Sequence, residues 1–553
     1  MSDGNDVREM TLAIEGMTCE RCAHSVDARL RAVPGVRHAQ TDHASGRAKI
    51  VATHDASPST LAAAVEHAGF RVVGREEHVE PGGTAVRAMG ELDLLVVGAG
   101  SAGFAAAIRG AELGATVAMV ERGALGGTCV NVGCVPSKTL IRAAETKRRA
   151  ERSPFNGIEP RLEAFDFRRV IAQKATLVRE LQQAKYWDVL AAYPTIRLIR
   201  GSARFRSDGT VEVDGDPIAA RKVIVATGAS PWAPPIPGLD SLEYLTSTTL
   251  MELEALPASL VAMGGGAVGL ELAQAFARFG TKVTVVEALP RLVSSEDEDL
   301  GAALESSLRS EGIGVHTGAT VRRVDGGPGR YRVVVDGPDG SRTIEGERIL
   351  VATGRRPNTS GLGLIEAGIA LGAKGEILVD EQLRTRRPDV YAAGDVIGDP
   401  AFVYVAAYAG ALATENALNG AARKYDLHAV PRVTFTDPAL ASVGLTESAA
   451  RAAGHEVLVS RLEMKHVPRA LAAHDTRGLV KLVADAKTRR LLGAHLLAPE
   501  AGDVIQEAVL AIRFGIGIDE LGSIMHPYLT SSEAIKLAAR AFDKDIAKLS
   551  CCA

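Results

Sequence analysis

The six cysteines of this chain form three close pairs: Cys19 with Cys22, Cys129 with Cys134, and Cys551 with Cys552. In a reducing compartment such pairs are typical of redox centres and soft-metal sites rather than of structural cross-links. Cys129 and Cys134 are five positions apart, so on a helical turn their sulfurs lie near one face. This spacing predicts either a disulfide or the binding of one soft metal ion by both sulfurs. The alternative is that both are buried core cysteines without a chemical role.

The neighbours of the second pair favour a redox centre. Residues 126–138 read GGTCVNVGCVPSK, and a glycine fingerprint lies upstream. Gly126, Gly127 and Gly133 let backbone approach a flat ring system where side chains would collide, which suits a flavin. The segment GTCVNVGCVPSK resembles the active-site segment of the flavin disulfide reductases, the family of lipoamide dehydrogenase, glutathione reductase and mercuric reductase.

Two segments of the chain each predict a Rossmann unit. In the first, a strand at 92–97 and a helix to about Leu113 precede a strand that ends in an acid; the second begins at Leu260. In such a unit the glycines allow the tight turn and the helix N-terminus holds the pyrophosphate of a dinucleotide. The acid accepts hydrogen bonds from the ribose hydroxyls of that dinucleotide. The glycines and acids are Gly98, Gly100, Gly103 and Glu121 in the first unit, and Gly264, Gly266, Gly269 and Glu287 in the second.

The family resemblance implies that an FAD domain is interrupted by a nicotinamide domain. VIVATGAS and ILVATGRRP would be the crossings between them, and Asp395 would contact the flavin's ribityl chain, with a helix N-cap as the alternative reading of that aspartate. Lys138 and Glu271 match an ion pair near flavin N5 that polarises the flavin during hydride transfer. The other cofactor-binding residues expected on this basis are Gly127, Thr128, Thr227, Gly228 and Gly354.

The choice of nicotinamide depends on the acid of the second unit. Glu287 suits the free ribose diol of NADH and repels the 2′-phosphate of NADPH, which favours NADH. Arg291 lies four residues on and offers a partner for that phosphate. Both nicotinamides therefore stay open.

The first 76 residues predict a small metal-binding domain. Residues 8–76 show a strand–helix–strand pattern twice, which is typical of the ferredoxin-like fold. Cys19 and Cys22 lie where the first helix begins, a position that lowers thiol pKa and favours soft-metal binding. GMTCxxC in this setting resembles the heavy-metal-associated domains, rather than a thioredoxin-type redox motif. Two thiolates at this spacing suit Cu(I) and Hg(II) equally, and 77–90 is predicted to be a flexible linker.

The C-terminal part, 429–553, resembles the interface domain through which two subunits of this family join, so we expect a homodimer. HPYLT resembles the PYLT segment of mercuric reductases, which implies that Tyr528 and Tyr186 line a mercuric ion site. His526 would be the acid–base group of a disulfide reductase if Glu533 were its partner, but the two are seven apart rather than five. The resemblance further implies that Cys551 and Cys552 carry Hg(II) to the active site of the other subunit.

Composition limits the partners. The chain has 553 residues, a net charge of −4 and no basic block, which argues against nucleic acid or an anionic membrane as its main partner. An acidic N-terminus without an apolar signal segment, and the lack of a long apolar run, predict a cytoplasmic protein.

The sequence thus predicts an α/β protein: two Rossmann-type domains and an α+β dimerisation domain after a βαββαβ metal-binding domain. We expect FAD at 91–240 with 356–428, and NAD(P)H at 241–355. The expected activity is reduction of Hg(II) by NAD(P)H through FAD and the cysteine pair. The rivals are a lipoamide dehydrogenase-like disulfide reductase with an accessory domain, and a metal chaperone whose flavin domain keeps its thiols reduced.

Overall fold

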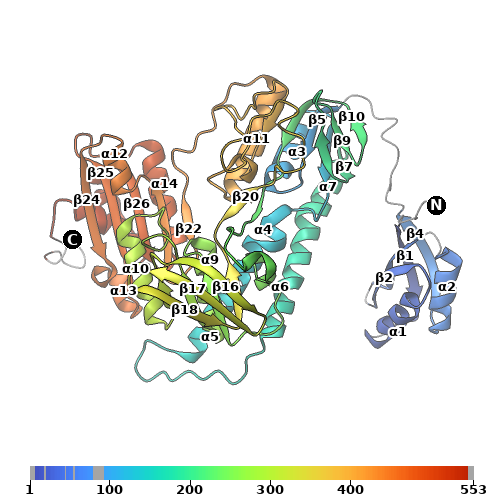
Figure 1. Cartoon of the computed structure of the whole chain (residues 1–553), viewed down its shortest axis with the longest axis horizontal. Helices are drawn as coiled ribbons and strands as arrows, with labels where there is room; N and C mark the ends of the chain where they lie inside the picture. Colours follow the sequence, from blue (N-terminus) through green and yellow to red (C-terminus); the bar gives the residue numbers. More distant parts are fainter. Residues whose placement is uncertain are drawn as a thin grey trace. The chain divides into compact units, whose positions relative to one another are not determined.

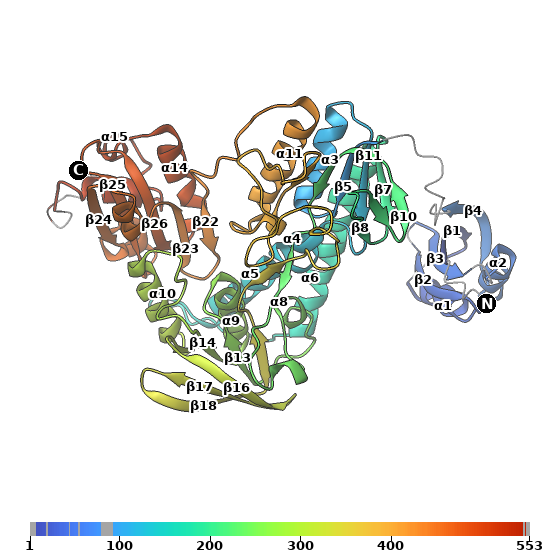
Figure 2. The same cartoon turned by 45° about the horizontal axis from the view of Figure 1, so that its top comes forward.

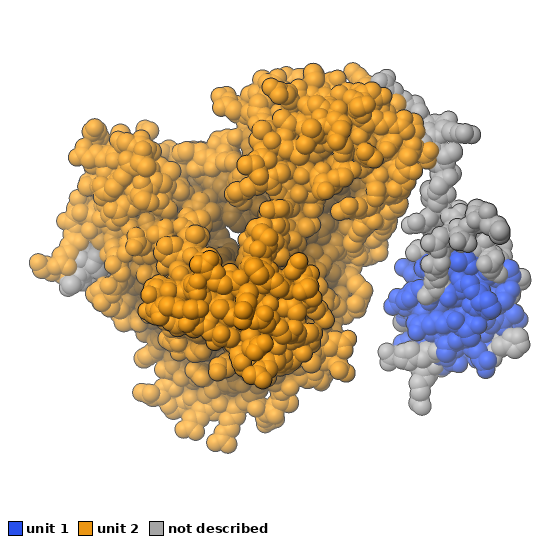
Figure 3. Space-filling model, in the orientation of Figure 1, with its two compact units in different colours: residues 1–90 blue, residues 91–553 orange. Residues whose placement is uncertain are grey.

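The structure is a computed structural model that describes residues 7–17, 20–43, 45–53, 56–78, 92–545 and 548. It divides into two units, residues 1–90 and residues 91–553 (Figure 3). Within the described residues, no helix combines the length and apolar composition needed to cross a bilayer.

The first unit has the predicted βαββαβ order. Its elements are β1 (Val7–Glu15), α1 (Glu20–Arg31), β2 (Val36–Asp42), β3 (Arg47–Thr53), α2 (Pro58–His67) and β4 (Arg71–His78). The strands form an antiparallel sheet in the order β2-β3-β1-β4, and α1 and α2 pack on it through fully buried residues such as Leu30 and Leu61 (Figure 1). Ser57 caps α2 and Pro58 begins it, as helix N-termini prefer. β4 runs to His78, further than the strand predicted at 70–73, and most of the predicted linker lies outside the described residues.

The first Rossmann sheet of the second unit is parallel, in the order β21-β11-β5-β6-β7. Its strands are β5 (Leu92–Val97), β6 (Val117–Glu121), β7 (Ile196–Arg200), β11 (Ala220–Val225) and β21 (Val390–Ala392). Helices α3 (Ser101–Glu112) and α11 (Val403–Asn419) lie side by side against it (Figures 1 and 2). A three-stranded antiparallel sheet of β8 (Ala203–Phe205), β9 (Val211–Val213) and β10 (Asp216–Ile218) accompanies it.

The second Rossmann sheet has the order β15-β14-β13-β19, also parallel. Its elements are β13 (Ser259–Met263), α9 (Ala267–Phe279), β14 (Lys282–Val286), α10 (Glu298–Ser310), β15 (Gly314–His316) and β19 (Arg348–Val351). The antiparallel strands β16 (Thr320–Gly327), β17 (Arg330–Gly337) and β18 (Gly340–Gly346) form a separate small sheet, and α8 (Ser247–Leu250) and η3 (Leu239–Ser241) precede β13. Strands β12 (Ala229–Pro231) and β20 (Arg355–Pro357) pair where the chain enters and leaves this part.

Helices that connect β6 to β7 carry the redox segment. They are α4 (Gly127–Val132), α5 (Cys134–Glu151), α6 (Phe167–Gln182), the π-helical turn η2 (Gln183–Trp187) and α7 (Asp188–Ala192). α5 packs against α9 of the second Rossmann unit, so the redox segment lies where the first and second Rossmann units meet. The short η4 (Asp395–Ile397) follows β21.

The C-terminal part is an antiparallel sheet in the order β22-β23-β26-β25-β24 with helices on it (Figure 2). Its strands are β22 (Arg432–Thr434), β23 (Ala439–Gly444), β24 (Val457–Glu463), β25 (Leu479–Asp485) and β26 (Leu491–Ala498). Its helices are α12 (Glu447–Ala452), η5 (Met464–His466), α13 (Pro468–Ala472), α14 (Ala501–Phe514), α15 (Ile518–Ser523) and α16 (Glu533–Arg540). The predicted fold class is confirmed, whereas the predicted domain boundaries stay predictions.

Candidate active site

A break between two helices sets the position of the redox cysteines. Cys129 lies in α4, Cys134 begins α5, and Gly133 separates the helices with φ −129° and ψ −106°. Gly126, just before α4, has a φ of 93°, and a Cβ on it would lie 2.8 Å from the ring of Tyr186, so this turn requires glycine. The cysteines thus come from two successive helices, which corrects the expectation of a single helical turn.

The two sulfurs differ in proton affinity. The Cys129 thiol hydrogen-bonds the Cys134 sulfur; burial opposes the effect and the charge of Lys138 adds to it, so that the pKa of Cys134 falls to about 7. The same hydrogen bond, burial and the negative charge of Cys134 raise the pKa of Cys129. Neither cysteine forms a disulfide in this structure. Near neutral pH the pair therefore holds one thiolate and one thiol, as thiolate exchange requires.

The predicted ion pair of Lys138 and Glu271 lies close enough to Cys134 for both charges to act on it. Lys138, one turn into α5, places Nζ 2.6 Å from Oε2 of Glu271 on α9. Glu271 is 6% exposed, and its Oε1 accepts the backbone N–H of Phe435 at 2.9 Å. The Phe435 ring centroid lies 4.5 Å from Nζ of Lys138. Phe435 belongs to the segment RVTFTDPALASVGLT, but no pattern in that segment indicates a contact with this ion pair.

Tyr186 lies against the redox loop (residues 126–134), in a stretch where the helix predicted over 181–190 is interrupted. Residues 183–187 form a π-helical turn, a feature often found at functional sites. The Tyr186 ring meets Phe104 edge-on, with the ring centroids 4.7 Å apart. Burial and then the negative charge of the cysteine pair raise the pKa of Tyr186, so its hydroxyl stays protonated beside the thiolate.

Two amide side chains brace the redox loop. Asn131, between the two cysteines, donates through Nδ2 to the carbonyl oxygens of Leu125 at 2.7 Å and Gly127 at 2.9 Å. Gln182, at the end of α6, donates to Oδ1 of Asn131 at 3.2 Å. Sequence reasoning missed both residues, although an amide inside an otherwise apolar and glycine-rich turn was a usable signal for Asn131.

The acids of the two Rossmann units make matching contacts. In each, one carboxylate oxygen accepts a backbone N–H from the glycine turn, and the other accepts one from the residue two positions after the acid. These bonds, 2.6 to 2.8 Å long, join Glu121 to Ala99 and Gly123, and Glu287 to Gly265 and Leu289. Both acids are therefore fixed at the rim of a glycine turn.

Both glycine turns fit a bound dinucleotide. Gly100 precedes α3 and Gly266 precedes α9, and neither helix start has a side-chain cap, which leaves first-turn N–H groups for a pyrophosphate. A Cβ on Gly103 would lie 1.9 Å from the carbonyl oxygen of Gly98, and one on Gly269 would lie 2.2 Å from that of Gly264. Only glycine allows these close approaches.

The crossing segments are tied to each other. Thr227 donates through Oγ1 to the carbonyl oxygen of Asn358 at 2.8 Å, and Nδ2 of Asn358 donates to that of Thr227 at 2.8 Å. The carbonyl of Gly228 accepts the Asn358 N–H at 2.9 Å, and that of Gly354 accepts the Trp232 N–H at 3.1 Å. The two crossings thus form one hydrogen-bonded strip.

Arg355 connects the predicted ribityl contact with the redox loop. Its guanidinium lies 3.9 Å from Oδ2 of Asp395 and donates to Oγ1 of Thr128 at 3.2 Å. Burial raises the pKa of Asp395; burial also lowers that of Arg355, against the charges of Asp395 and Cys134. Gly394, not Asp395, takes the N-cap position of η4, so the N-cap alternative is wrong. Arg355 lies in the quoted ATGRRP segment, yet sequence reasoning did not select it.

His526 has a carboxylate partner other than the one considered from the sequence. Its Nε2 lies 2.8 Å from Oε1 of Glu507 on α14, and its Nδ1 lies 3.0 Å from the Ile524 carbonyl oxygen. Both ring nitrogens therefore lie within hydrogen-bond distance of an oxygen atom. Glu533 instead accepts the backbone N–H of Leu529 at 3.4 Å.

The remaining metal-site predictions are only partly covered by the described residues. Cys22 lies half-buried on α1, and Tyr528 is 50% exposed on the segment after α15. Cys19, Cys551 and Cys552 lie outside the described residues. Their predicted roles stay predictions.

Arg291 is occupied within its own loop. Its guanidinium donates to the carbonyl oxygens of Ser294 at 2.9 Å and Glu296 at 3.4 Å, and lies 3.6 Å from the Glu298 carboxylate. These contacts turn the predicted phosphate partner towards acceptors of the protein itself.

Comparison with known families matches three parts of the chain. Residues 92–410 match the pyridine nucleotide-disulphide oxidoreductases, 430–539 match their dimerisation domain, and 11–71 match the heavy-metal-associated domain. Among solved structures, the HOCl-induced flavoprotein disulfide reductase RclA from Escherichia coli is similar, with 32% identity and a TM-score of 0.72 over 81% of this chain and 99% of that one. LpdA from Mycobacterium tuberculosis is similar to the same extent, with 30% identity and a TM-score of 0.72 over 81% and 99%.

The chain therefore belongs to the pyridine nucleotide-disulphide oxidoreductases, the FAD-dependent enzymes that use NAD(P)H. Curated relatives narrow this further. A mercuric reductase of Staphylococcus aureus is 43% identical over 542 residues, 98% of both chains, and one of Streptomyces lividans is 49% identical over 467 residues, 83% of this chain and 98% of that one. Within its family the chain belongs with the mercuric reductases.

Proposed function

We propose that this chain reduces Hg(II) to elemental mercury with electrons from NAD(P)H, as a step in mercury detoxification. The observation that carries the proposal is the unequal pair Cys129 and Cys134, a thiol and a thiolate next to Lys138 and between two dinucleotide-binding turns. Hg(II) is a soft ion that two thiolates bind strongly, and the heavy-metal-associated match at 11–71 supports a soft metal as the cargo.

The residues around the pair suggest how each contributes. FAD, when bound, takes electrons from NAD(P)H and exchanges them with the cysteine pair. Glu121, Asp395 and the turn before α3 would hold it. Cys134, as the thiolate, is the first ligand of an arriving Hg(II), and Cys129 becomes the second when it loses its proton. Lys138 lowers the electrostatic cost of two neighbouring thiolates.

We further propose the route of the ion. Hg(II) binds Cys19 and Cys22, passes to Cys551 and Cys552 of the partner subunit, and reaches Cys129 and Cys134 by exchange from sulfur to sulfur. Each exchange keeps the ion ligated, so free Hg(II) is never released. The match of 430–539 to a dimerisation domain supports a homodimer, which this route between subunits requires. The cytoplasmic location expected from the sequence stays a prediction, which cell fractionation tests.

We propose NADH as the preferred nicotinamide. Glu287 is held at the rim of the second glycine turn, where a 2′-phosphate would meet its negative charge. Arg291, the phosphate partner considered from the sequence, already donates to two backbone carbonyls.

The test is NADH and NADPH oxidation that depends on Hg(II), measured together with release of mercury vapour. Wild type is compared with Cys129→Ala and with the double variant Cys551→Ala, Cys552→Ala. We expect vapour from wild type only with a nicotinamide donor, none from Cys129→Ala, and a large loss in the double variant when Hg(II) arrives as a thiol complex. Wild type that oxidises NADH without releasing mercury would refute the proposal.

A disulfide reductase is the second candidate, because His526 has a carboxylate partner. A histidine paired with a glutamate can protonate a leaving thiolate, and Glu507 takes that place here. Turnover of lipoamide or another disulfide substrate, lost in His526→Gln and without turnover of Hg(II), would select this candidate.

A further inference from the structure

Phe435 contacts both members of the Lys138–Glu271 ion pair. Its backbone N–H donates to Oε1 of Glu271, whose Oε2 faces Lys138, so both oxygens of this buried carboxylate are occupied. Its ring covers the ammonium at 4.5 Å from Nζ, within the range in which an aromatic face attracts a cation. Phe435 is 37% exposed, so burial alone does not explain an aromatic residue here.

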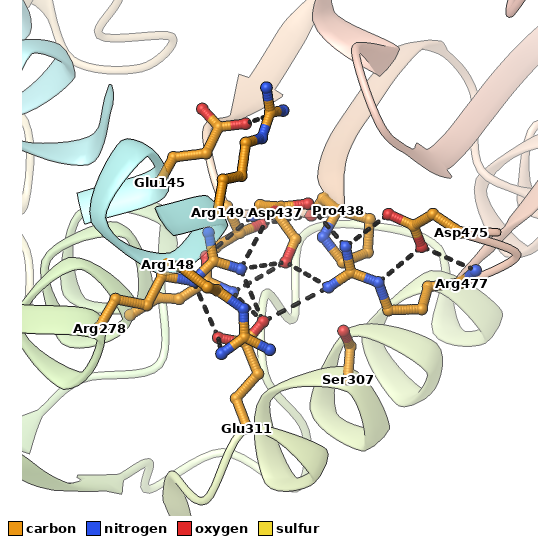
Figure 4. Close-up of polar contacts among 12 residues, drawn as sticks. Glu145, Arg148, Arg149, Arg278, Ser307, Glu311, Asp437, Pro438, Asp475 and Arg477 are labelled. Atoms are coloured by element: carbon orange, nitrogen blue, oxygen red, sulfur yellow. Dashed lines mark hydrogen bonds and ion pairs between the residues drawn. The ribbon is translucent and has the colours of Figure 1, made fainter. Parts of the chain in front are cut away.

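A cluster of charged residues fixes the chain two positions further on. Asp437 Oδ2 lies 2.9 Å from Arg278, Oδ1 lies 2.9 Å from Arg477, and both arginines pair with Glu311 (Figure 4). Gln274, one turn after Glu271 on α9, donates to the Asp437 carbonyl oxygen at 2.9 Å and accepts its N–H at 2.8 Å. The same helix therefore holds Glu271 and the segment that carries Phe435.

This arrangement ties the C-terminal part of the chain to the redox segment. Arg278 and Glu311 are among the most buried charges of the cluster, and a buried pair resists separation because each charge left alone would be desolvated. Asp437 is thus held firmly, and the short connection from β22 leaves Phe435 little freedom. The position of the Lys138 ammonium depends in turn on that ring and on Glu271.

We propose that Phe435 is a positioning residue that fixes the ammonium of Lys138 where it acts on the flavin, and that it does so from the C-terminal part of the chain. The proposal rests on the proposed role of Lys138 near the flavin. A cation held in place next to a flavin stabilises the reduced flavin, which gains negative charge. A cation that moves freely in water stabilises it less, because solvent screens the interaction.

The test replaces the ring without altering the backbone contact. Phe435→Leu keeps an apolar side chain but removes the aromatic face, whereas Phe435→Tyr keeps that face. Both are made in wild type and in a Lys138→Met background. Phe155→Leu is the matched control, because Phe155 is 43% exposed and its ring meets His474 instead of an ion pair. The measurements are the midpoint potential of the bound flavin and the single-turnover rate of its reduction by NADH, both on the full-length flavoprotein without Hg(II).

We expect Phe435→Leu to lower the potential and to slow flavin reduction about two- to five-fold, the range that a partly exposed cation–aromatic contact corresponds to. Phe435→Tyr and Phe155→Leu should match wild type. In the Lys138→Met background Phe435→Leu should have no further effect. An equal effect in both backgrounds, an equal loss in Phe435→Tyr, or no effect at all would overturn the proposal. Because Hg(II) is absent, these results stand apart from the mercury assay: a protein that fails that assay can still show the background-dependent effect.

Discussion

Replacement of Cys129 by alanine should raise the pKa of Cys134. The hydrogen bond from the Cys129 thiol is the largest cause that lowers this pKa to about 7, from an ordinary value of 9.0. Alanine removes the donor and leaves burial, which raises the pKa, and the charge of Lys138, which lowers it. Serine keeps a donor at the same place, so Cys129→Ser is the matched control.

The size of the effect follows from the strength of such a bond. A hydrogen bond to a charged group contributes about 1.5–3 kcal/mol, and one pKa unit corresponds to about 1.4 kcal/mol, so the pKa should rise by roughly one to two units. At pH 7 the thiolate fraction of Cys134 would then fall from about a half to between about a tenth and a hundredth. The sign is fixed: removal of a donor to the thiolate always favours the thiol.

The assay is alkylation of the reduced protein by iodoacetamide from pH 5 to pH 10, with Cys134 followed by fragment ions in mass spectrometry. The midpoint of the pH curve is the readout, because the intrinsic reactivity of a thiolate rises with its pKa and partly hides the change in rate at one pH. A midpoint near 7 in wild type and Cys129→Ser, and near 8 to 9 in Cys129→Ala, is expected. An unchanged midpoint in Cys129→Ala would refute the reasoning that the two thiols are coupled.

Three further outcomes are expected. Lys481→Met leaves the buried carboxylate of Asp297 unpaired and should lower the free energy of unfolding by about 3–5 kcal/mol at pH 7 in urea titrations, against about 0–1 kcal/mol for the exposed Arg461→Met. Burial raises the pKa of Asp297, but the hydrogen bond and charge of Lys481 outweigh burial, so the pKa is lowered. The stability from this pair is therefore present above the ordinary carboxyl range and is lost as the pH falls through the lowered pKa. The difference in unfolding free energy between Lys481→Met and wild type should accordingly disappear in acid. Gly103→Ala should purify with less bound FAD, measured by absorbance, because its Cβ would meet a backbone carbonyl. Arg291→Ala should leave the KM for NADPH unchanged, and a rise in that KM would show that the guanidinium leaves its carbonyl partners to bind phosphate.

The glycine turns could be predicted closely because their requirements are local. The strand predicted at 92–97 has those bounds in β5, and the helix predicted to about Leu113 ends at Glu112. A buried strand, a turn that requires glycine and an amphipathic helix each depend on adjacent residues, so the sequence contains the whole signal. The ferredoxin-like order of the first unit could be predicted for the same reason.

The redox loop was less predictable because several backbone conformations are compatible with the same cysteine spacing. The spacing of five between the two cysteines fits one helical turn. The presence of glycine at position 133 does not by itself reveal that one helix ends there and another begins at Cys134. The π-helical turn at Tyr186 is likewise a local deviation that packing selects, since a regular helix through 181–190 satisfies the sequence pattern equally well.

The proton affinity of the cysteine pair depends on the surrounding fold as well as on its motif. GTCVNVGCVPSK supplies both sulfurs and Lys138, and these alone would predict a strongly acidic thiol. Glu271, from the second Rossmann unit, opposes Lys138 at Cys134, while Arg355 brings a second cation whose charge acts on Cys134. The balance between them is set by contacts between segments far apart in the chain. The motif therefore identifies the nucleophile and supplies the hydrogen bond that lowers its pKa most, whereas burial and Glu271, which oppose that bond, come from the way the chain packs around it.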